Sequence, residues 1–152
     1  MAKLTINDIS AALRKLDICM MTTTNSEGML ESRPMSNNKD VDYAGDSYFF
    51  TLDKTSAVRD LKSKPQVCLA YEGRRNMLAA PIYLCVSGVA ELIKDRAQLE
   101  KHWAKDLEIW FDKGIDTPGL TLIHVTAHHI KYWDGMDEGE VTLPAIHKQR
   151  AM

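Results

Sequence analysis

The order of strand-like and helix-like segments is the feature that most constrains how this chain can fold. Runs rich in β-branched, aromatic and aliphatic residues predict strands over Ile18–Thr24, Met29–Ser36, Ser47–Thr51, Gln66–Tyr71, Pro81–Ile93 and Leu120–Trp133. Helices are predicted over Ile6–Leu16, over Ser56–Lys64 and after Asp95. Strands and helices do not alternate regularly, as they do in doubly wound parallel folds. The order therefore predicts a mainly β, α+β domain, in which antiparallel strands form a closed or partly closed barrel with peripheral helices.

Local signals set the expected boundaries of these elements. Thr5 and Asp8 have the spacing of a capping box before the first helix, and Pro65 ends the second helix. Gly88 interrupts the longest strand and indicates a bulge or a bend. Apolar spacings of three and four continue the third helix through Leu99, His102, Trp103, Leu107, Trp110 and Phe111. Polar residues mark a loop over residues 37–46 and a mobile tail after Asp134.

Composition narrows the class of protein. The 152 residues suit one compact domain, and an apolar fraction of 45% is enough to build a core. A net charge of -2 argues against a nucleic-acid partner, since such affinity depends on neutralising phosphates. No apolar run approaches the roughly 20 residues that span a bilayer, and the start has no apolar leader, so we expect a cytoplasmic protein without a membrane partner.

Cysteine and histidine spacing gives no metal motif. Cys19, Cys68 and Cys85 stand singly in apolar segments, which predicts buried, reduced thiols and no disulfide framework. The five histidines lack the spacings of metal ligands, so no metal is expected. Catalytic triads, paired carboxylates and glycine-rich phosphate loops are also missing from the sequence. No catalytic residue is therefore assigned, and any chemistry is expected to come from a cofactor.

Three stretches could bind such a cofactor. Arg33 precedes Pro34 on a strand, where it either presents a guanidinium to an anion or is a solvated edge arginine. Lys54, Thr55 and Ser56 lie where a strand leads into a helix start, a place that favours a phosphate, although Thr55 or Ser56 could serve only as the helix cap. Trp133, at a strand end, either flanks a planar cofactor or covers the core.

Five segments together resemble the pyridoxamine 5'-phosphate oxidase-like, FMN-binding split-barrel family, and more narrowly its general stress protein 26 branch. They are Met20–Thr24, Ser32–Met35, Phe49–Thr51, Val86–Glu91 and Tyr132–Gly135, within a match that extends from Ile6 to Gly135. The resemblance implies a six-stranded antiparallel split barrel over residues 1–135, a polar tail over 136–152, and a homodimer with FMN in a groove at the subunit interface. It implies that the cofactor is bound by Arg33, Pro34, Met35, Ser36, Phe50, Thr51, Lys54, Thr55, Ser56, Tyr83, Trp110 and Trp133.

Two departures from the family pattern affect the expected function. The family's Ser-Arg-Lys triplet in the phosphate loop is Thr55-Ser56-Ala57 here, so the positive charge must come from Lys54, Arg33 or a residue such as Arg59. The basic C-terminal segment that grips the vitamin phosphate in the oxidases is acidic here, which argues against pyridoxamine 5'-phosphate oxidation.

Three functional hypotheses remain. The leading one is an FMN-binding general stress protein acting as a flavin-dependent oxidoreductase on an unidentified small-molecule partner. A non-catalytic flavin carrier or sensor is the second, and pyridoxamine 5'-phosphate oxidation is the third and disfavoured one. Related split barrels also bind haem or deazaflavin, which a visible spectrum distinguishes from FMN.

Overall fold

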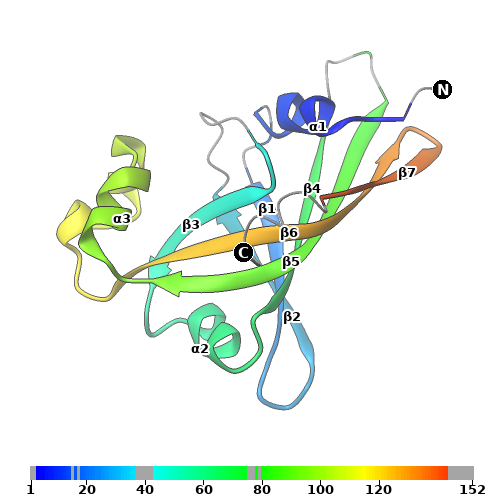
Figure 1. Cartoon of the computed structure of the whole chain (residues 1–152). Helices are drawn as coiled ribbons and strands as arrows, with labels where there is room; N and C mark the ends of the chain where they lie inside the picture. The colour runs from blue at the N-terminus through cyan, green and yellow to red at the C-terminus, as the bar shows by residue number, and fades with distance from the viewer. Residues whose placement is uncertain are drawn as a thin grey trace.

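The seven described strands form one antiparallel sheet that curls around an apolar core (Figure 1). This computed structural model describes residues 3–14, 16, 18–36, 43–74, 78 and 80–143. The strands are β1 Ile18–Thr24, β2 Leu30–Ser36, β3 Asp46–Leu52, β4 Gln66–Arg74, β5 Pro81–Ile93, β6 Leu120–Asp134 and β7 Asp137–Thr142. The helices are α1 Ile6–Leu13, α2 Ser56–Ser63 and α3 Arg96–His102. Two 3₁₀ turns, Lys105–Ile109 and Gly114–Asp116, follow α3.

The sheet has an opening between its first and last strands. The strand order is β2-β1-β4-β5-β6-β3, and β7 pairs with β6 beside this path. Among the described residues, no pairing joins β2 to β3, so the curled sheet stays open there. The predicted class, an antiparallel split barrel with peripheral helices, is confirmed.

Alternation along the strands separates a buried face from an outer face. In β1, Cys19, Met21 and Thr23 point inward, whereas Ile18 and Met20 are exposed. α1 and α2 lie on opposite sides of the curled sheet in Figure 1, and both pack against the main core, α1 through Ile9 and α2 through Leu61. The two helices therefore close the ends of the barrel.

The first part of β6 is buried on both faces. Ile123 and Val125 belong to the main core, whereas Leu120 and Leu122 belong to a second cluster with Leu99 and Phe111. This second cluster attaches α3 and the following 3₁₀ turns to β3 and β6. It lies beside the opening of the barrel and shapes one wall of it.

The bulge predicted at Gly88 is confirmed. The register between β5 and β6 shifts between Ser87 and Gly88. A Cβ at Gly88 would lie 2.1 Å from the carbonyl oxygen of Thr126, so the two backbones approach too closely for any side chain there.

The structure differs from the expected elements mainly in α1, in the third helix and in the tail. α1 ends at Leu13 rather than Leu16. The third helix ends at His102, where Trp103 turns to extended backbone, and the chain continues in 3₁₀ turns to Asp116. The polar tail contains a strand, since Asp137–Thr142 pairs with His129–Asp134 as β7. The loop predicted over 37–46 lies mostly outside the described residues, as do residues 144–152 of the tail.

Candidate functional site

A groove of about 380 Å³ lies at the opening between β2 and β3. Phe50 and Thr51 from β3 line one side, and Pro34 and Met35 from β2 line the other. The complete lining is Ile18, Pro34, Met35, Ser36, Phe49, Phe50, Thr51, Leu52, Thr55, Leu107, Trp110 and Phe111. The groove is thus mainly apolar and aromatic, with hydroxyl groups along one side.

A second hollow, of about 610 Å³, adjoins the groove at the start of α2. Lys54, Arg59 and Lys62 supply three positive charges, and Asp53, Thr55 and Ser63 complete its lining. Thr55 lines both the groove and this basic hollow. The two spaces are therefore neighbours, one apolar and the other cationic.

The helix start at the basic hollow has no side-chain cap. Thr55 occupies the N-cap position with extended backbone, but its hydroxyl donates to the carbonyl oxygen of Leu52 at 2.9 Å and does not cap the helix. The first backbone N–H groups of α2 are consequently left for another acceptor, and the positive end of the helix dipole adds to the charge of the hollow.

Asp53 is the one carboxylate in the lining of the basic hollow, and it forms an ion pair with Lys94, which is not part of that lining. Lys94 donates to Asp53 at 2.8 Å and thereby lowers the pKa of that carboxyl below its ordinary value, with smaller contributions from Lys62 and Lys54. Asp53 is therefore ionised at neutral pH, and Lys94 compensates its charge. The net charge of the hollow remains positive.

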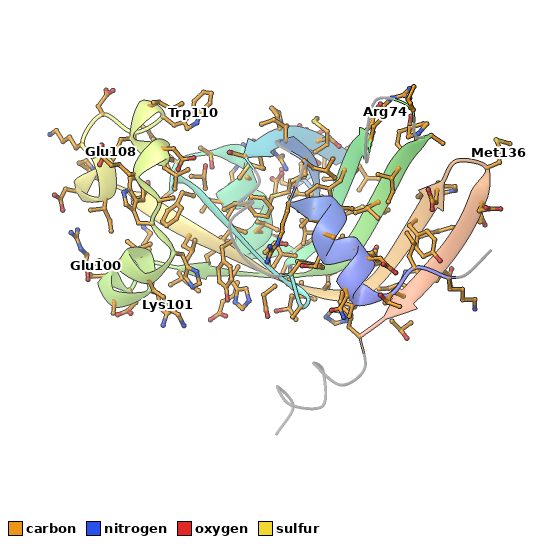
Figure 2. All side chains as sticks on the ribbon, turned by 90° about the horizontal axis from the view of Figure 1, so that it is seen from above. Arg74, Glu100, Lys101, Glu108, Trp110 and Met136 are labelled. Atoms are coloured by element: carbon orange, nitrogen blue, oxygen red, sulfur yellow. The ribbon has the colours of Figure 1, made fainter. Side chains whose placement is uncertain are left out.

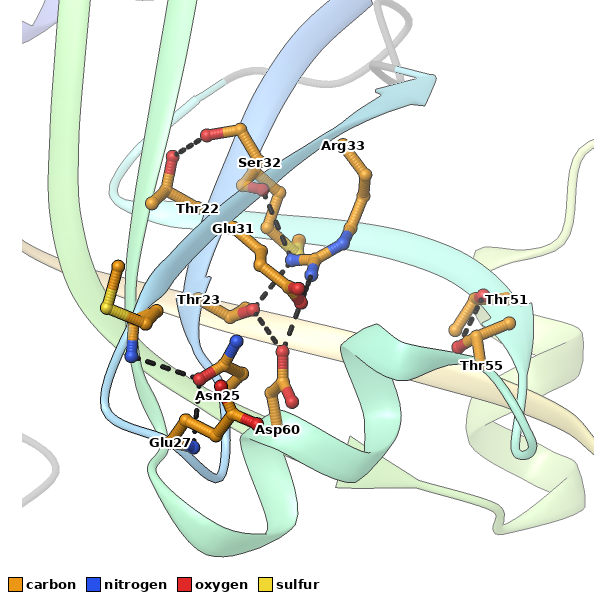
Figure 3. Close-up of polar contacts among 12 residues, drawn as sticks. Thr22, Thr23, Asn25, Glu27, Glu31, Ser32, Arg33, Thr51, Thr55 and Asp60 are labelled. Carbon is orange, nitrogen blue, oxygen red and sulfur yellow. Dashed lines mark hydrogen bonds and ion pairs between the residues drawn. The ribbon is translucent and has the colours of Figure 1, made fainter.

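Arg33 is directed away from the groove and toward α2 (Figure 3). Its Nη1 donates to the Thr23 hydroxyl at 2.7 Å, and its Nη2 lies 3.4 Å from a carboxylate oxygen of Asp60. Thr23 also donates to Asp60 at 2.8 Å. The side chain of Arg33 is 17% exposed, so it is neither a solvated edge arginine nor a lining residue of the groove.

Tyr83 and Trp133 do not line the groove. They are direct cross-strand partners on β5 and β6, whereas Leu52 beside the groove pairs with Leu120, thirteen residues earlier on β6. At about 3.3 Å per residue this separation is roughly 40 Å along the strand. Figure 2 shows Trp110 at one end of the molecule and Met136, in the β6–β7 turn, at the other. Both rings thus lie far from the β3 side of the groove. On its other side, Cys19 next to the lining residue Ile18 is opposite Tyr71, and Tyr71 is opposite Leu84, so Tyr83 is two strands away.

The surroundings of Trp133 are polar. Its indole Nε1 donates to Glu138 on β7 at 3.0 Å, and the Lys131 ammonium lies 5.3 Å from the ring centroid. Tyr83 is 39% exposed on the outer face of the sheet. The two rings thus lie on an outer surface of the barrel.

The structure therefore divides the twelve predicted site residues into groups. Seven line the groove: Pro34, Met35, Ser36, Phe50, Thr51, Thr55 and Trp110. Lys54 lines the basic hollow and Ser56 begins α2 between the two spaces. Arg33, Tyr83 and Trp133 lie outside both.

Sequence reasoning did not include Lys62, Leu107 and Phe111 in the site. Lys62 follows Arg59 by three residues, which puts both on one face of α2, and this spacing was a usable signal. Leu107 and Phe111 were assigned to helix packing alone, yet they both pack in the second cluster and line the groove.

The described residues contain neither a metal-ligand cluster nor a membrane-spanning helix. In that part of the chain, no group of three or more His, Cys, Asp or Glu side chains could hold a metal ion. Nor does any described helix have the length and apolar character needed to cross a membrane.

Comparison with known sequences identifies relatives. The family model described as "Pyridoxamine 5'-phosphate oxidase like" matches residues 5–151. Protein bli-3 of Neurospora crassa is 29% identical over 136 residues, which cover 82% of this chain and 63% of that protein. The matched region thus spans less than two thirds of the length of that curated relative.

Solved structures share the fold. A protein related to general stress protein 26 from Clostridium acetobutylicum superposes with a TM-score of 0.78 and 23% identity, covering 93% of this chain and 96% of that one. The General Stress Protein 26 from Bacillus anthracis gives a TM-score of 0.68 with 21% identity, covering 86% and 92%. A heme binding protein from Mycobacterium smegmatis gives 0.73 with 14% identity, covering 95% of this chain and 61% of that one.

Proposed function

Because the chain belongs to the pyridoxamine 5'-phosphate oxidase-like family, we propose that it is a homodimeric, cytoplasmic FMN-binding protein of the general stress protein type. Members of this family commonly bind flavin and are usually dimeric. The chain's own residues supply the argument for FMN in particular.

The proposal rests on one observation. Thr55 lines both the apolar groove and the basic hollow, so the two spaces adjoin each other. FMN combines a flat, largely apolar ring with a polar chain that ends in a phosphate dianion. A groove of about 380 Å³ is within the ordinary range for small-molecule sites. A ligand apolar at one end and doubly negative at the other matches both spaces.

Each wall of the site has a distinct role in binding. Phe50, Met35 and Trp110 would contact the ring, and Thr51 and Ser36 would offer hydroxyls to its polar edge. Lys54, Arg59 and Lys62, together with the uncapped start of α2, would hold the phosphate. When bound, FMN supplies electron transfer, whereas the protein binds it, orients it and excludes water from one of its sides.

The positions of Tyr83 and Trp133 support a site shared by two subunits. Both are expected to contact the cofactor, yet neither lines the groove of its own chain. A partner chain that supplies Tyr83 and Trp133 to this groove reconciles the two facts. The homodimer is therefore part of the proposal.

The β7 strand argues against a phosphorylated substrate. Asp137, Glu138 and Glu140 lie on the strand that pairs with the Trp133 end of β6, and Glu138 accepts the indole hydrogen bond. Negative charges there repel a vitamin phosphate. We propose an oxidoreductase of an unphosphorylated small molecule. The alternative, a flavin carrier or sensor, is favoured if neither NADH nor NADPH reduces the bound flavin.

The test is a titration of the purified protein with FMN and with riboflavin, which lacks the phosphate. Arg59→Ala and Lys62→Ala should each weaken FMN binding roughly ten- to a hundred-fold, as loss of a charge-assisted hydrogen bond predicts, and should leave riboflavin binding unchanged. Lys101→Ala, an exposed cation on α3, is the matched control and should change neither.

Two outcomes would contradict the proposal. One is a colourless protein that neither flavin titrates. The other is a bound chromophore with a haem or deazaflavin spectrum, which would keep the fold and replace the cofactor.

A further inference from the structure

Two of the three cysteines meet on the outer face of the sheet. Cys68 on β4 and Cys85 on β5 place their Sγ atoms 3.0 Å apart, close enough for one thiol to donate to the other. Both side chains are partly exposed, whereas Cys19 is 1% exposed and faces the core from β1. The structure therefore brings together one pair of thiols and keeps the third away from it.

Small neighbours make this contact possible. Cys68 and Cys85 are diagonal partners, since Cys68 is directly opposite Ser87, and Cys85 is directly opposite Ala70. Neither Ser87 nor Ala70 has a side chain long enough to separate the two sulfur atoms. Cys68 also lines an open hollow of about 700 Å³ with Thr22 and His128, through which a small oxidant can reach the pair.

We propose that Cys68 and Cys85 form a reversible dithiol–disulfide couple that hydroperoxides oxidise. One thiol reacts with hydrogen peroxide to give a sulfenic acid and one water molecule. The second thiol then attacks that sulfur, the S–S bond forms, and a second water molecule leaves. In total two thiols lose two electrons and two protons, and one peroxide becomes two waters. The proposal does not depend on flavin binding.

Burial affects the reactivity of Cys68. Burial, followed by the neighbouring Cys85, raises the pKa of Cys68 to about 12. Cys68 therefore stays protonated at neutral pH and reacts poorly with peroxide, which attacks thiolates. Trapping of the sulfenic acid in the single-serine variants identifies which of the two thiols reacts first.

The diagonal position makes the disulfide easy to reduce. Diagonal positions on adjacent antiparallel strands are about 7 to 8 Å apart, whereas disulfides usually join Cα atoms up to about 6.8 Å apart. By this geometry a diagonal disulfide is more strained than an ordinary one, and strained disulfides are the ones that cellular thiols reduce. The couple suits reversible regulation better than permanent stabilisation.

The experiment treats the purified full-length protein with hydrogen peroxide and analyses it without reduction. Thiol titration in denaturant should fall from three groups to one, and the intact mass should fall by two hydrogen atoms. Peptide mapping should join the peptide that contains Cys68 to the peptide that contains Cys85. Dithiothreitol should restore all three thiols.

Serine variants make the test specific. Cys19→Ser should form the same disulfide, whereas Cys68→Ser and Cys85→Ser should not. With a sulfenic-acid trap, at least one of Cys68→Ser and Cys85→Ser should be labelled at its remaining thiol of the pair, and the labelled variant identifies the thiol that peroxide attacks first. The proposal is overturned if oxidised wild-type protein keeps three thiols, if its cysteines form cross-links between chains, or if they proceed to sulfinic acid without a disulfide.

Discussion

At the scale of single residues, Arg33 connects three elements that are separate in the sequence. From β2 its side chain reaches Thr23 on β1 and Asp60 on α2, and Asp60 is only 3% exposed. A buried carboxylate needs such partners, because an uncompensated charge in the interior is costly. Arg33 thus holds α2, and with it the basic hollow, in place against the β1–β2 hairpin.

Arg33→Ala is expected to destabilise the fold. The substitution leaves the Asp60 carboxylate with the Thr23 hydroxyl but without the guanidinium, and breaking a buried ion pair costs about 3 kcal/mol. Urea unfolding monitored by circular dichroism measures this loss. The double variant Arg33→Met/Asp60→Asn should recover most of it, because no buried charge remains. Unchanged unfolding together with weakened flavin binding would instead return Arg33 to the ligand role that the sequence suggested.

At this scale the structure brings together those predicted residues whose contacts are local. Phe50, Thr51 and Thr55 lie within a few residues of a strand end and a helix start, so their shared position at the groove follows from local structure. The pairing of Arg33 with Asp60 does not follow from local structure. Asp60 is 27 residues away in the sequence, on a helix that only the tertiary fold brings next to Arg33.

At the scale of elements, aromatic packing decides where α3 ends. The ring of His102 stacks on Tyr48 at a centroid distance of 3.7 Å, and Trp103 meets Phe50 edge-on at 5.1 Å. Both contacts join the end of α3 to β3. The spacing of apolar residues along the sequence therefore could not show that the helix ends at His102. The pattern did identify buried positions, since Leu99 and Phe111 both enter the second cluster, whereas Trp110 is 67% exposed at the groove.

Gly88 is the position in the long strands that is least tolerant of a side chain. Gly88→Ala is expected to lower the free energy of unfolding by about 2 to 3 kcal/mol, because its Cβ would overlap the Thr126 carbonyl and force the strands apart. Chemical denaturation measures the change. The neighbouring Ser87→Ala, at an exposed position, is the control and should change little; equal stability of the two variants would show that the bulge is not needed.

The β7 strand was missed because its composition opposes strand formation. Asp, Glu and Gly dominate Asp137–Thr142, and each is depleted in strands. Pairing with β6 overrides this propensity, and Gly139 lets the Tyr132 ring lie against the β7 backbone. Charges on an edge strand also discourage unwanted pairing with other chains, so the composition has a structural explanation.

At the scale of the whole molecule, the proposed site requires two copies of the chain, and this can be tested by mixing subunits. A double variant Arg59→Ala/Lys62→Ala removes cations from the basic hollow, and Trp133→Leu removes the ring at the far end of β6. Neither variant alone should bind FMN tightly. Refolded together in equal amounts, they should recover about a quarter of the sites, because half of the dimers are mixed and each has one intact site.

The control is each variant refolded alone, which should recover no sites. Absence of recovery in a mixture that forms dimers would mean that Trp133 acts within its own subunit or does not contact the cofactor. Full FMN binding by Trp133→Leu alone would likewise contradict a site shared through that residue.

The opening between β2 and β3 also bears on how such a protein can evolve. A barrel closed by a complete ladder of backbone hydrogen bonds has its circumference fixed by strand number and stagger. In the described part of this chain no ladder spans the opening, so side chains set the aperture there. Substitutions at the rim can widen or narrow it without disturbing the scaffold. That freedom is consistent with a heme binding protein and general stress proteins sharing one architecture.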